Sequence, residues 1–195
     1  MNLSALRSNL EERGYKTSFF ETAQEASRYL NQEIDGVSVG IGGSVTVQEM
    51  HLSESLSGHN QVLWHWDQAS LSAVAKTDVY ISSVNGLAET GEMINIDGSG
   101  NRISSTLFGH KKVYFLVGMN KIAPDYEKAL HRARNVAAPL NAKRLRRNTP
   151  CAEKGDRCYD CKSPQRICKA LSVFWEKPDL AGEAEVVLIN QKLGF

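Results

Sequence analysis

The fold class is decided by the stretch Gly36-Val37-Ser38-Val39-Gly40-Ile41-Gly42-Gly43-Ser44-Val45-Thr46. Its first half is short and rich in β-branched residues, which is typical of a strand. Two glycines then allow a tight turn, and Ser44 stands where its hydroxyl would cap the helix that follows. The stretch therefore predicts a strand, a glycine turn and a helix in direct succession.

Strands and helices alternate along the rest of the chain in the same way. Further strands are expected at residues 15–20, 61–66, 78–84, 112–117 and 185–189. Helices are expected at residues 2–13, 22–30, about 47–56, 68–76 and 124–137. This alternation predicts an α/β fold with a mainly parallel sheet flanked by helices. Residues 93–96 and 102–107 are the exception, because the turn-rich residues 97–101 between them favour a hairpin.

Composition excludes several classes of protein. The chain has 195 residues, with 23 Lys and Arg against 22 Asp and Glu, so it lacks the strong positive charge of a dedicated nucleic-acid binder. Its apolar runs, such as Val113–Val117, are far shorter than the ~20 residues of a membrane-spanning helix. The first residues lack the basic and apolar regions of a secretory signal. We therefore expect a cytoplasmic protein that binds neither nucleic acid nor membranes.

All four cysteines lie in one short window with the spacing C-x6-C-x2-C-x6-C: Cys151, Cys158, Cys161 and Cys168. Because the cytosol keeps thiols reduced, such a cluster favours a metal site over a disulfide framework. Zinc sites prefer paired C-x2-C knuckles and iron–sulfur clusters use other spacings, so the spacing leaves both zinc and a [4Fe–4S] cluster open. Disulfides formed in air are a further alternative.

The cysteine window also sets the domain organisation. The helical pattern stops at Thr149-Pro150, directly before the first cysteine. We expect one domain over residues 1–195, with residues 1–147 as its main part. Residues 148–170 would form a small cysteine-rich, metal-binding lobe within it.

The glycine turn is the first candidate binding site. Its backbone N–H groups and the helix N-terminus could hold an anion, with Gly42, Gly43, Ser44 and Thr46 as the contacts. Val45 breaks the dinucleotide fingerprint and no Gly-Lys-Ser/Thr follows, so neither a nicotinamide or flavin motif nor a P-loop is present. The alternative is a tight turn capped by Ser44 without a ligand.

Other polar residues are weaker candidates for catalysis or ligand binding. Glu89 follows the strand at 78–84 among small residues, and partial burial would let it act as a base or nucleophile; a surface turn is the alternative. Asp97 and Asn101 could contact a ligand, or simply form the hairpin turn. His65 and His110 stand in no metal-ligand spacing, so we expect them to be packing or surface residues.

A basic stretch precedes and overlaps the cysteine window. No acidic residue occurs from Lys128 to Ala152, whereas several lysines and arginines do. Such a run could attract an anionic substrate or the acidic face of a partner. The alternative is a solvated helix face balanced by acidic residues elsewhere in the chain.

Several segments together resemble the LUD domain of lactate-utilization proteins, the LutC/YkgG group. The matching segments are residues 39–46, 83–91, 95–102, 108–112 and 134–142. The likeness extends from about residue 2 to Phe195 and includes the cysteine window, which looks like that of the short, stand-alone members.

The resemblance implies a fold like that of the NagB/RpiA/CoA-transferase group, in which a glycine–serine loop holds phosphate or another anion. It supports a small organic anion at the loop of residues 42–46, with Glu89 as the catalytic nucleophile or base. Thr90, Gly91, Asp97 and Asn101 are candidates for contacts with the same ligand. For the family, the implied process is oxidation of L-lactate to pyruvate by a multi-subunit system with iron–sulfur centres.

Electron counting limits what the chain does alone. Oxidation of lactate removes two electrons, whereas one cubane cluster normally carries one. We therefore expect electron-transfer partner subunits or another acceptor, and an oligomer is compatible with this. Two alternatives stay open: a ligand-binding or regulatory protein with a structural zinc, and a CoA- or phosphosugar-processing enzyme that uses Glu89 covalently.

Overall fold

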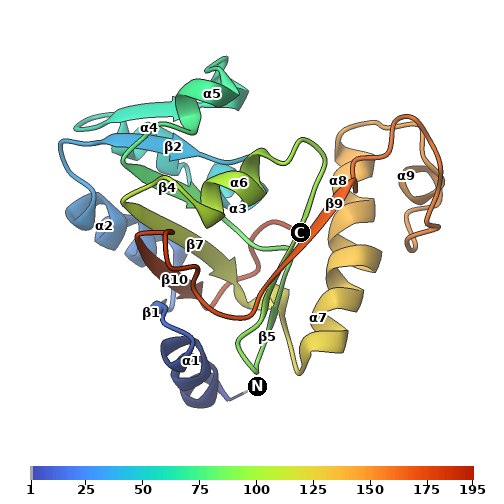
Figure 1. Cartoon of the computed structure of the whole chain (residues 1–195), viewed down its shortest axis with the longest axis horizontal. Helices are drawn as coiled ribbons and strands as arrows, with labels where there is room; N and C mark the ends of the chain where they lie inside the picture. The colour runs from blue at the N-terminus through green and yellow to red at the C-terminus, as the bar shows by residue number, and fades with distance from the viewer. Residues whose placement is uncertain (1) are drawn as a thin grey trace.

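Two sheets form the framework of the structure, a computed structural model that describes residues 2–195 (Figure 1). Met1, which the expected domain includes, lies outside the described residues. The larger sheet contains, in spatial order, β1 (Lys16–Phe20), β10 (Glu183–Ile189), β7 (Lys112–Gly118), β4 (Val79–Ser82), β2 (Ser38–Ile41) and β3 (Gln61–Trp64). The smaller sheet contains β8 (Ile122–Ala123), β5 (Gly86–Ala88), β6 (Met93–Asp97) and β9 (Ala170–Phe174).

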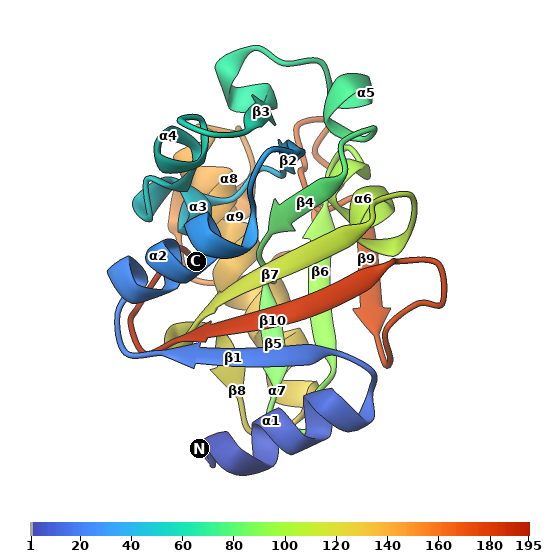
Figure 2. The same ribbon diagram turned by 90° about the vertical axis from the view of Figure 1, so that its left-hand side faces the viewer.

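Every neighbouring pair in the six-stranded sheet is parallel, which confirms the expected α/β architecture. Figure 2 shows the six strands side by side, with the smaller sheet behind them. The central strand β7 is buried on both faces, and this explains why its sequence is almost continuously apolar.

Helices cover both faces of this sheet. On one face, Leu30 of α2 (Ala23–Glu33) and Val47 of α3 (Val45–Glu49) pack in the same core as Leu116. On the other face, Leu10 of α1 (Leu3–Glu12) packs in the same core as Phe115. The adjacent residues Phe115 and Leu116 of β7 thus pack in the cores on opposite faces of the sheet, because successive side chains of a strand point to opposite faces. The remaining short helices of this region are α4 (Leu52–Leu56), the 3-10 turn η1 (His65–Asp67) and α5 (Leu71–Val74).

The hairpin expected around residues 97–101 is wrong. Residues Asn101–Leu107 form the helix α6, and β6 pairs instead with β5 and β9, both antiparallel. The reason is the Asp97 carboxylate, which accepts backbone N–H groups of Ser99, Arg102 and Ile103 at 3.1, 3.0 and 3.3 Å. It thereby satisfies free N–H groups at the start of the helix, as a cap does.

One continuous helical rod forms the wall on the right of Figure 1, longer than the expected helix at 124–137. It consists of α7 (Tyr126–Arg132), the π-helical segment η3 (Ala133–Ala137) and α8 (Ala138–Arg144). Pro139 lacks the N–H for an ordinary helical bond, and the preceding N–H of Ala138 reaches back five residues to Ala133. The proline thus widens the helix locally without ending it.

The cysteine-rich segment lies against this rod. The helix α9 (Pro150–Lys154) packs on α8, and the chain then continues without regular structure to β9. The strand β9 was not expected, because its five residues give only a short alternating signal. Within residues 2–195, no helix combines the length and apolarity that crossing a membrane requires.

The close packing around β2 leaves no room for a side chain at position 40. A Cβ added there would lie 2.5 Å from Thr77 Oγ1 and 2.6 Å from the carbonyl oxygen of Val74. Because such overpacking costs about 1–3 kcal/mol, Gly40→Ala should lower the free energy of unfolding by that amount in urea denaturation. Gly58→Ala is the matched control, since the nearest atom to its added Cβ is 3.8 Å away. Equal stability of the two variants would contradict the packing described for β2.

Candidate functional site

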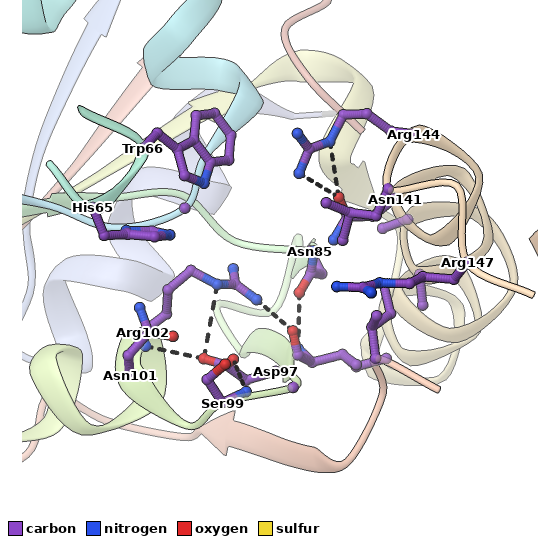
Figure 3. A pocket seen from close by; sticks show the side chains of 17 residues that line it. His65, Trp66, Asn85, Asp97, Ser99, Asn101, Arg102, Asn141, Arg144 and Arg147 are labelled. Atoms are coloured by element: carbon purple, nitrogen blue, oxygen red, sulfur yellow. Dashed lines mark hydrogen bonds and ion pairs between the residues drawn. The ribbon is translucent and has the colours of Figure 1, made fainter. Parts of the chain in front are cut away.

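Loops at the carboxyl ends of four neighbouring strands line two adjoining cavities. The strands are β7, β4, β2 and β3, and parallel sheets bind ligands at this edge. The larger cavity, of about 270 Å³, lies between these loops and the end of the helical rod (Figure 3). Its polar and aromatic lining consists of His65, Trp66, Asn85, Asp97, Ser99, Asn101, Arg102, Asn141, Arg144 and Arg147, with Gly43 at the loop.

A smaller cavity, of about 40 Å³, adjoins the larger one. It is lined by Ser44, Ser83, Lys121 and Phe195, among others. Gly43, Asn85, Arg102, Asn141 and Arg144 line both cavities. The two therefore form two compartments of one site, and the smaller has room for about one water-sized group.

The glycine loop lies at this site, as the sequence predicts. Ser44 accepts the backbone N–H of Val47 at 3.3 Å, so it caps α3 and also lines the smaller cavity. Gly42 is required by close packing, since a Cβ there would lie 2.5 Å from the Tyr80 hydroxyl. A Cβ on Gly43 would lie 3.2 Å from Cε1 of His65. The loop is thus both a capped turn and one wall of a cavity.

Lys121 is the site residue that sequence reasoning missed. It lies in the 3-10 turn η2 (Met119–Lys121) directly after β7, and its side chain is only 3% exposed. Its ammonium nitrogen lies 2.8 Å from Thr46 Oγ1 and 2.8 Å from Ser83 Oγ. Burial, helped by Arg132 and Arg102 and opposed by Glu49, lowers the pKa of Lys121 to about 7. A lysine at the end of a buried strand is the signal that would have found it.

Three arginines give the larger cavity its charge. Figure 3 shows Arg102 of α6 on one side of the cavity, with Arg144 and Arg147 on the other; Arg144 ends the rod, and Arg147 lies in the connection from α8 to α9. Arg144 donates two hydrogen bonds to Asn141 Oδ1, at 3.0 and 2.9 Å, and its guanidinium lies 4.8 Å from the centre of the Trp66 ring. Within residues 2–195, Arg147 forms no ion pair.

Asp97 is the single acidic side chain among the residues that line the two cavities. Its oxygens already accept the three backbone N–H groups at the start of α6, and it lies 3.8 Å from Arg102 Nε. Arg102 also donates to the carbonyl of Ile96. The remaining charge of the site is positive, so it is suited to a small anion. Asn101 lines the same cavity.

The two histidines, His65 and His110, lie in different surroundings. His65 lines the larger cavity beside Gly43, and burial lowers its pKa, so its imidazole is neutral at neutral pH. His110 is buried, with Nδ1 2.7 Å from the carbonyl oxygen of Thr77 and its ring stacked on Tyr80. It is a packing residue.

Glu89, Thr90 and Gly91 lie elsewhere. They form the tight connection between β5 and β6, and they contact α1. Asn9 donates to the carbonyl oxygen of Glu89 at 2.7 Å, and Arg13 donates to that of Thr90 at 2.9 Å. None of the three lines either cavity. The expectation that Glu89 acts beside the glycine loop is therefore not met, because the chain turns away from the sheet edge after Asn85.

Comparison with known proteins identifies the family. A family model of the LUD domain matches residues 3–189. The chain belongs to the LUD domain family. No curated protein gave a significant match to this LUD-domain chain.

One solved structure agrees with this assignment at the level of the fold. A DUF162 family protein from Deinococcus radiodurans aligns with 96% of the LUD-domain chain and 95% of its own, with a TM-score of 0.56 at 12% identity. Ribose 5-phosphate isomerase A from Neisseria gonorrhoeae matches 52% of the chain and 53% of its own, with a TM-score of 0.35 at 17% identity. The second likeness is partial and carries no functional conclusion.

The four cysteines of the LUD-domain chain are free thiols, each half-buried. Two receive hydrogen bonds at sulfur: the backbone N–H of Asp160 lies 3.3 Å from Cys158 Sγ, and Arg166 Nη2 lies 3.5 Å from Cys168 Sγ. These two cysteines line a separate cavity of about 190 Å³.

The donor set has the right chemistry for zinc or an iron–sulfur cluster, but its arrangement does not fit one. In the part of the chain that the structure describes, no three side chains of His, Cys, Asp or Glu are grouped so as to hold a metal ion. Among the described residues, the expected four-thiol site is thus not assembled in this conformation.

The pKa of Lys121 predicts a pH dependence of stability. Between about pH 7 and the ordinary lysine pKa of 10.5, the unfolded chain holds a proton on Lys121 that the folded protein lacks. The free energy of unfolding should therefore rise with pH in this window, by up to ~1.4 kcal/mol per pH unit, relative to Lys121→Met. Below about pH 7 the difference should be constant. Urea denaturation of both proteins from about pH 6 to pH 9 measures this, and parallel curves would contradict the burial of a titrating amine.

Proposed function

We propose that this LUD-domain chain binds a small 2-hydroxy or 2-oxo carboxylate, such as lactate or pyruvate, as a component of L-lactate oxidation. The LUD domain family is associated with lactate utilization. The observation that carries the proposal is the charge of the site: three arginines, Arg102, Arg144 and Arg147, line its cavities, against one acidic side chain, Asp97.

Guanidinium groups suit this ligand class. A guanidinium donates two parallel hydrogen bonds to a carboxylate, and such charge-assisted bonds are about twice as strong as neutral ones. Arg147 is available for this role, because within residues 2–195 it has no acidic partner. The amide groups of Asn85 and Asn101 could bind the hydroxyl or carbonyl at C2 of the ligand. At about 270 Å³ the larger cavity is at the small end of ligand pockets, which favours a small molecule.

The oxidation itself requires an electron acceptor. Removing two electrons from a 2-hydroxy acid demands a hydride acceptor or an electron-transfer chain, and the sequence carries no flavin or nicotinamide fingerprint. We therefore propose that partner subunits supply the acceptor. This chain would contribute the binding site for the organic acid.

The cysteine segment is proposed to bind a metal or an iron–sulfur cluster after rearrangement. What supports this is the presence of four free thiols in residues 151–168, two of them already accepting N–H groups at sulfur. The segment between α9 and β9 has no regular structure that would oppose its closing around an inorganic centre. If bound, a fully ligated cluster would transfer electrons, and a zinc ion would hold the segment together.

Ligand binding tests the charge argument. Isothermal titration of the full chain with pyruvate and with L-lactate should show binding, and Arg147→Gln should weaken it about tenfold or more, because a charge-assisted hydrogen bond is lost. Arg146→Gln removes the same charge one residue away, outside both cavities, and should leave the affinity unchanged. No binding of either acid, or equal losses in the two variants, would contradict the proposed function.

Metal analysis tests the cysteine segment. Chain purified without oxygen should contain iron with inorganic sulfide, or zinc, in stoichiometric amount, and Cys161→Ser should lower that content. Visible absorption distinguishes the two metals, since only the cluster is coloured. A wild-type chain that takes up neither metal when reconstituted under reductant would overturn this part of the proposal.

A further inference from the structure

The hydrogen bonds around Lys121 show that its amine donates to both neighbouring hydroxyl groups. The hydroxyl of Thr46 lies 3.3 Å from the carbonyl oxygen of Leu193, and the hydroxyl of Ser83 donates to the carbonyl oxygen of Leu116 at 2.6 Å. Each hydroxyl has a single proton, and here it is committed to a carbonyl. Both therefore act as acceptors toward Lys121, whose Nζ donates to each at 2.8 Å.

This arrangement suits a neutral amine. A neutral amine has two N–H groups and one lone pair, and the hydrogen bonds to Thr46 and Ser83 use both N–H groups. Within residues 2–195, Lys121 has no ion-pair partner; its burial and the charges of Arg132 and Arg102 disfavour the charged form, and only the charge of Glu49 favours it. A fully buried lysine without a carboxylate is uncommon, because an unpaired buried charge is costly. The lone pair is thus left without a hydrogen-bond donor.

The same amine lines the smaller cavity together with Arg102 and Arg144. Both arginines also line the larger cavity, so a carboxylate held by them would lie next to the compartment that contains Lys121. A desolvated lysine beside cationic groups is the arrangement that turns an amine into a nucleophile toward carbonyl carbon.

We propose that Lys121 is a carbonyl-reactive amine that forms an imine with a small 2-oxo carboxylate bound at this site. The inference rests on the proposed function and names the oxidised acid as the ligand that reacts. A 2-hydroxy acid has no electrophilic carbon at C2, whereas the 2-oxo acid formed by its oxidation does. The site would thus distinguish the product of the oxidation from its substrate by covalent bonding.

The step balances without an oxidant or reductant. The lone pair of Nζ attacks C2 of the 2-oxo acid, and a C–N bond forms as the carbonyl π bond breaks. The two protons of the amine leave with the carbonyl oxygen as one molecule of water, and a C=N bond is left. Thr46 and Ser83 hold the amine in place before the attack. With a pKa of about 7, the neutral fraction of Lys121 near pH 7 is roughly a thousand times that of an exposed lysine.

Reductive trapping tests the proposal. The full chain is incubated with pyruvate and sodium cyanoborohydride, and peptides are mapped by mass spectrometry. We expect a carboxyethyl adduct predominantly on Lys121, no adduct when lactate replaces pyruvate, and no adduct at position 121 in Lys121→Arg. Labelling of exposed lysines such as Lys143 with Lys121 unmodified would overturn the proposal.

A parallel titration separates this inference from the proposed function. If wild type and Lys121→Arg both bind pyruvate by calorimetry and wild type gives no adduct on Lys121, the imine is overturned and the binding site stands. If neither calorimetry nor trapping detects pyruvate, both are overturned. Circular dichroism verifies that Lys121→Arg folds, and Lys121→Met serves as the second variant that lacks the amine.

Discussion

One buried amine connects the ends of three strands. Lys121 follows β7, its partner Ser83 follows β4, and its partner Thr46 belongs to the helix that follows β2. These strands are neighbours in the sheet, so their loops can meet only at the carboxyl edge where the amine lies. Two hydrogen bonds offset part of the free energy that burying the amine costs. The lowered pKa offsets more of it, because the amine can lose its proton and be buried without a charge. The position of the glycine loop, and with it both cavities, depends on this arrangement.

The helical rod completes the site from the opposite side. Pro139 widens the rod into a π-helical segment whose last residue, Ala137, lines both cavities. Arg144, the last residue of the rod, and Arg147, in the connection that follows it, face Arg102 across the larger cavity (Figure 3). π-helical segments often occur at functional sites, and here the segment lies directly beside the cavity. The loops of the sheet edge thus supply most of the polar groups, and the rod together with the connection that follows it supplies two of the three arginines.

Local sequence features were sufficient to predict the framework. The strand, glycine turn and capped helix of residues 36–46 were predictable because neighbouring residues determine them. The role of Asp97 could not be predicted, because the residue types around it favour a tight hairpin turn and a helix cap equally. The pairing of β6 with β9 decides in favour of the cap. Lys121, Arg102 and Arg144 converge only through the strand order, which the pattern of a single strand does not reveal. Glu89 was misplaced for the same reason, because the direction of the chain after β5 depends on its packing against α1.

We propose above all that a small carboxylate binds between the loops of the sheet edge and the two arginines opposite them, Arg144 and Arg147. A crystal structure of the chain with pyruvate tests it most directly. The account predicts the carboxylate within hydrogen-bonding distance of Arg144 or Arg147, with C2 directed toward Lys121. Pyruvate bound away from this edge, for example beside Glu89 and α1, would contradict it.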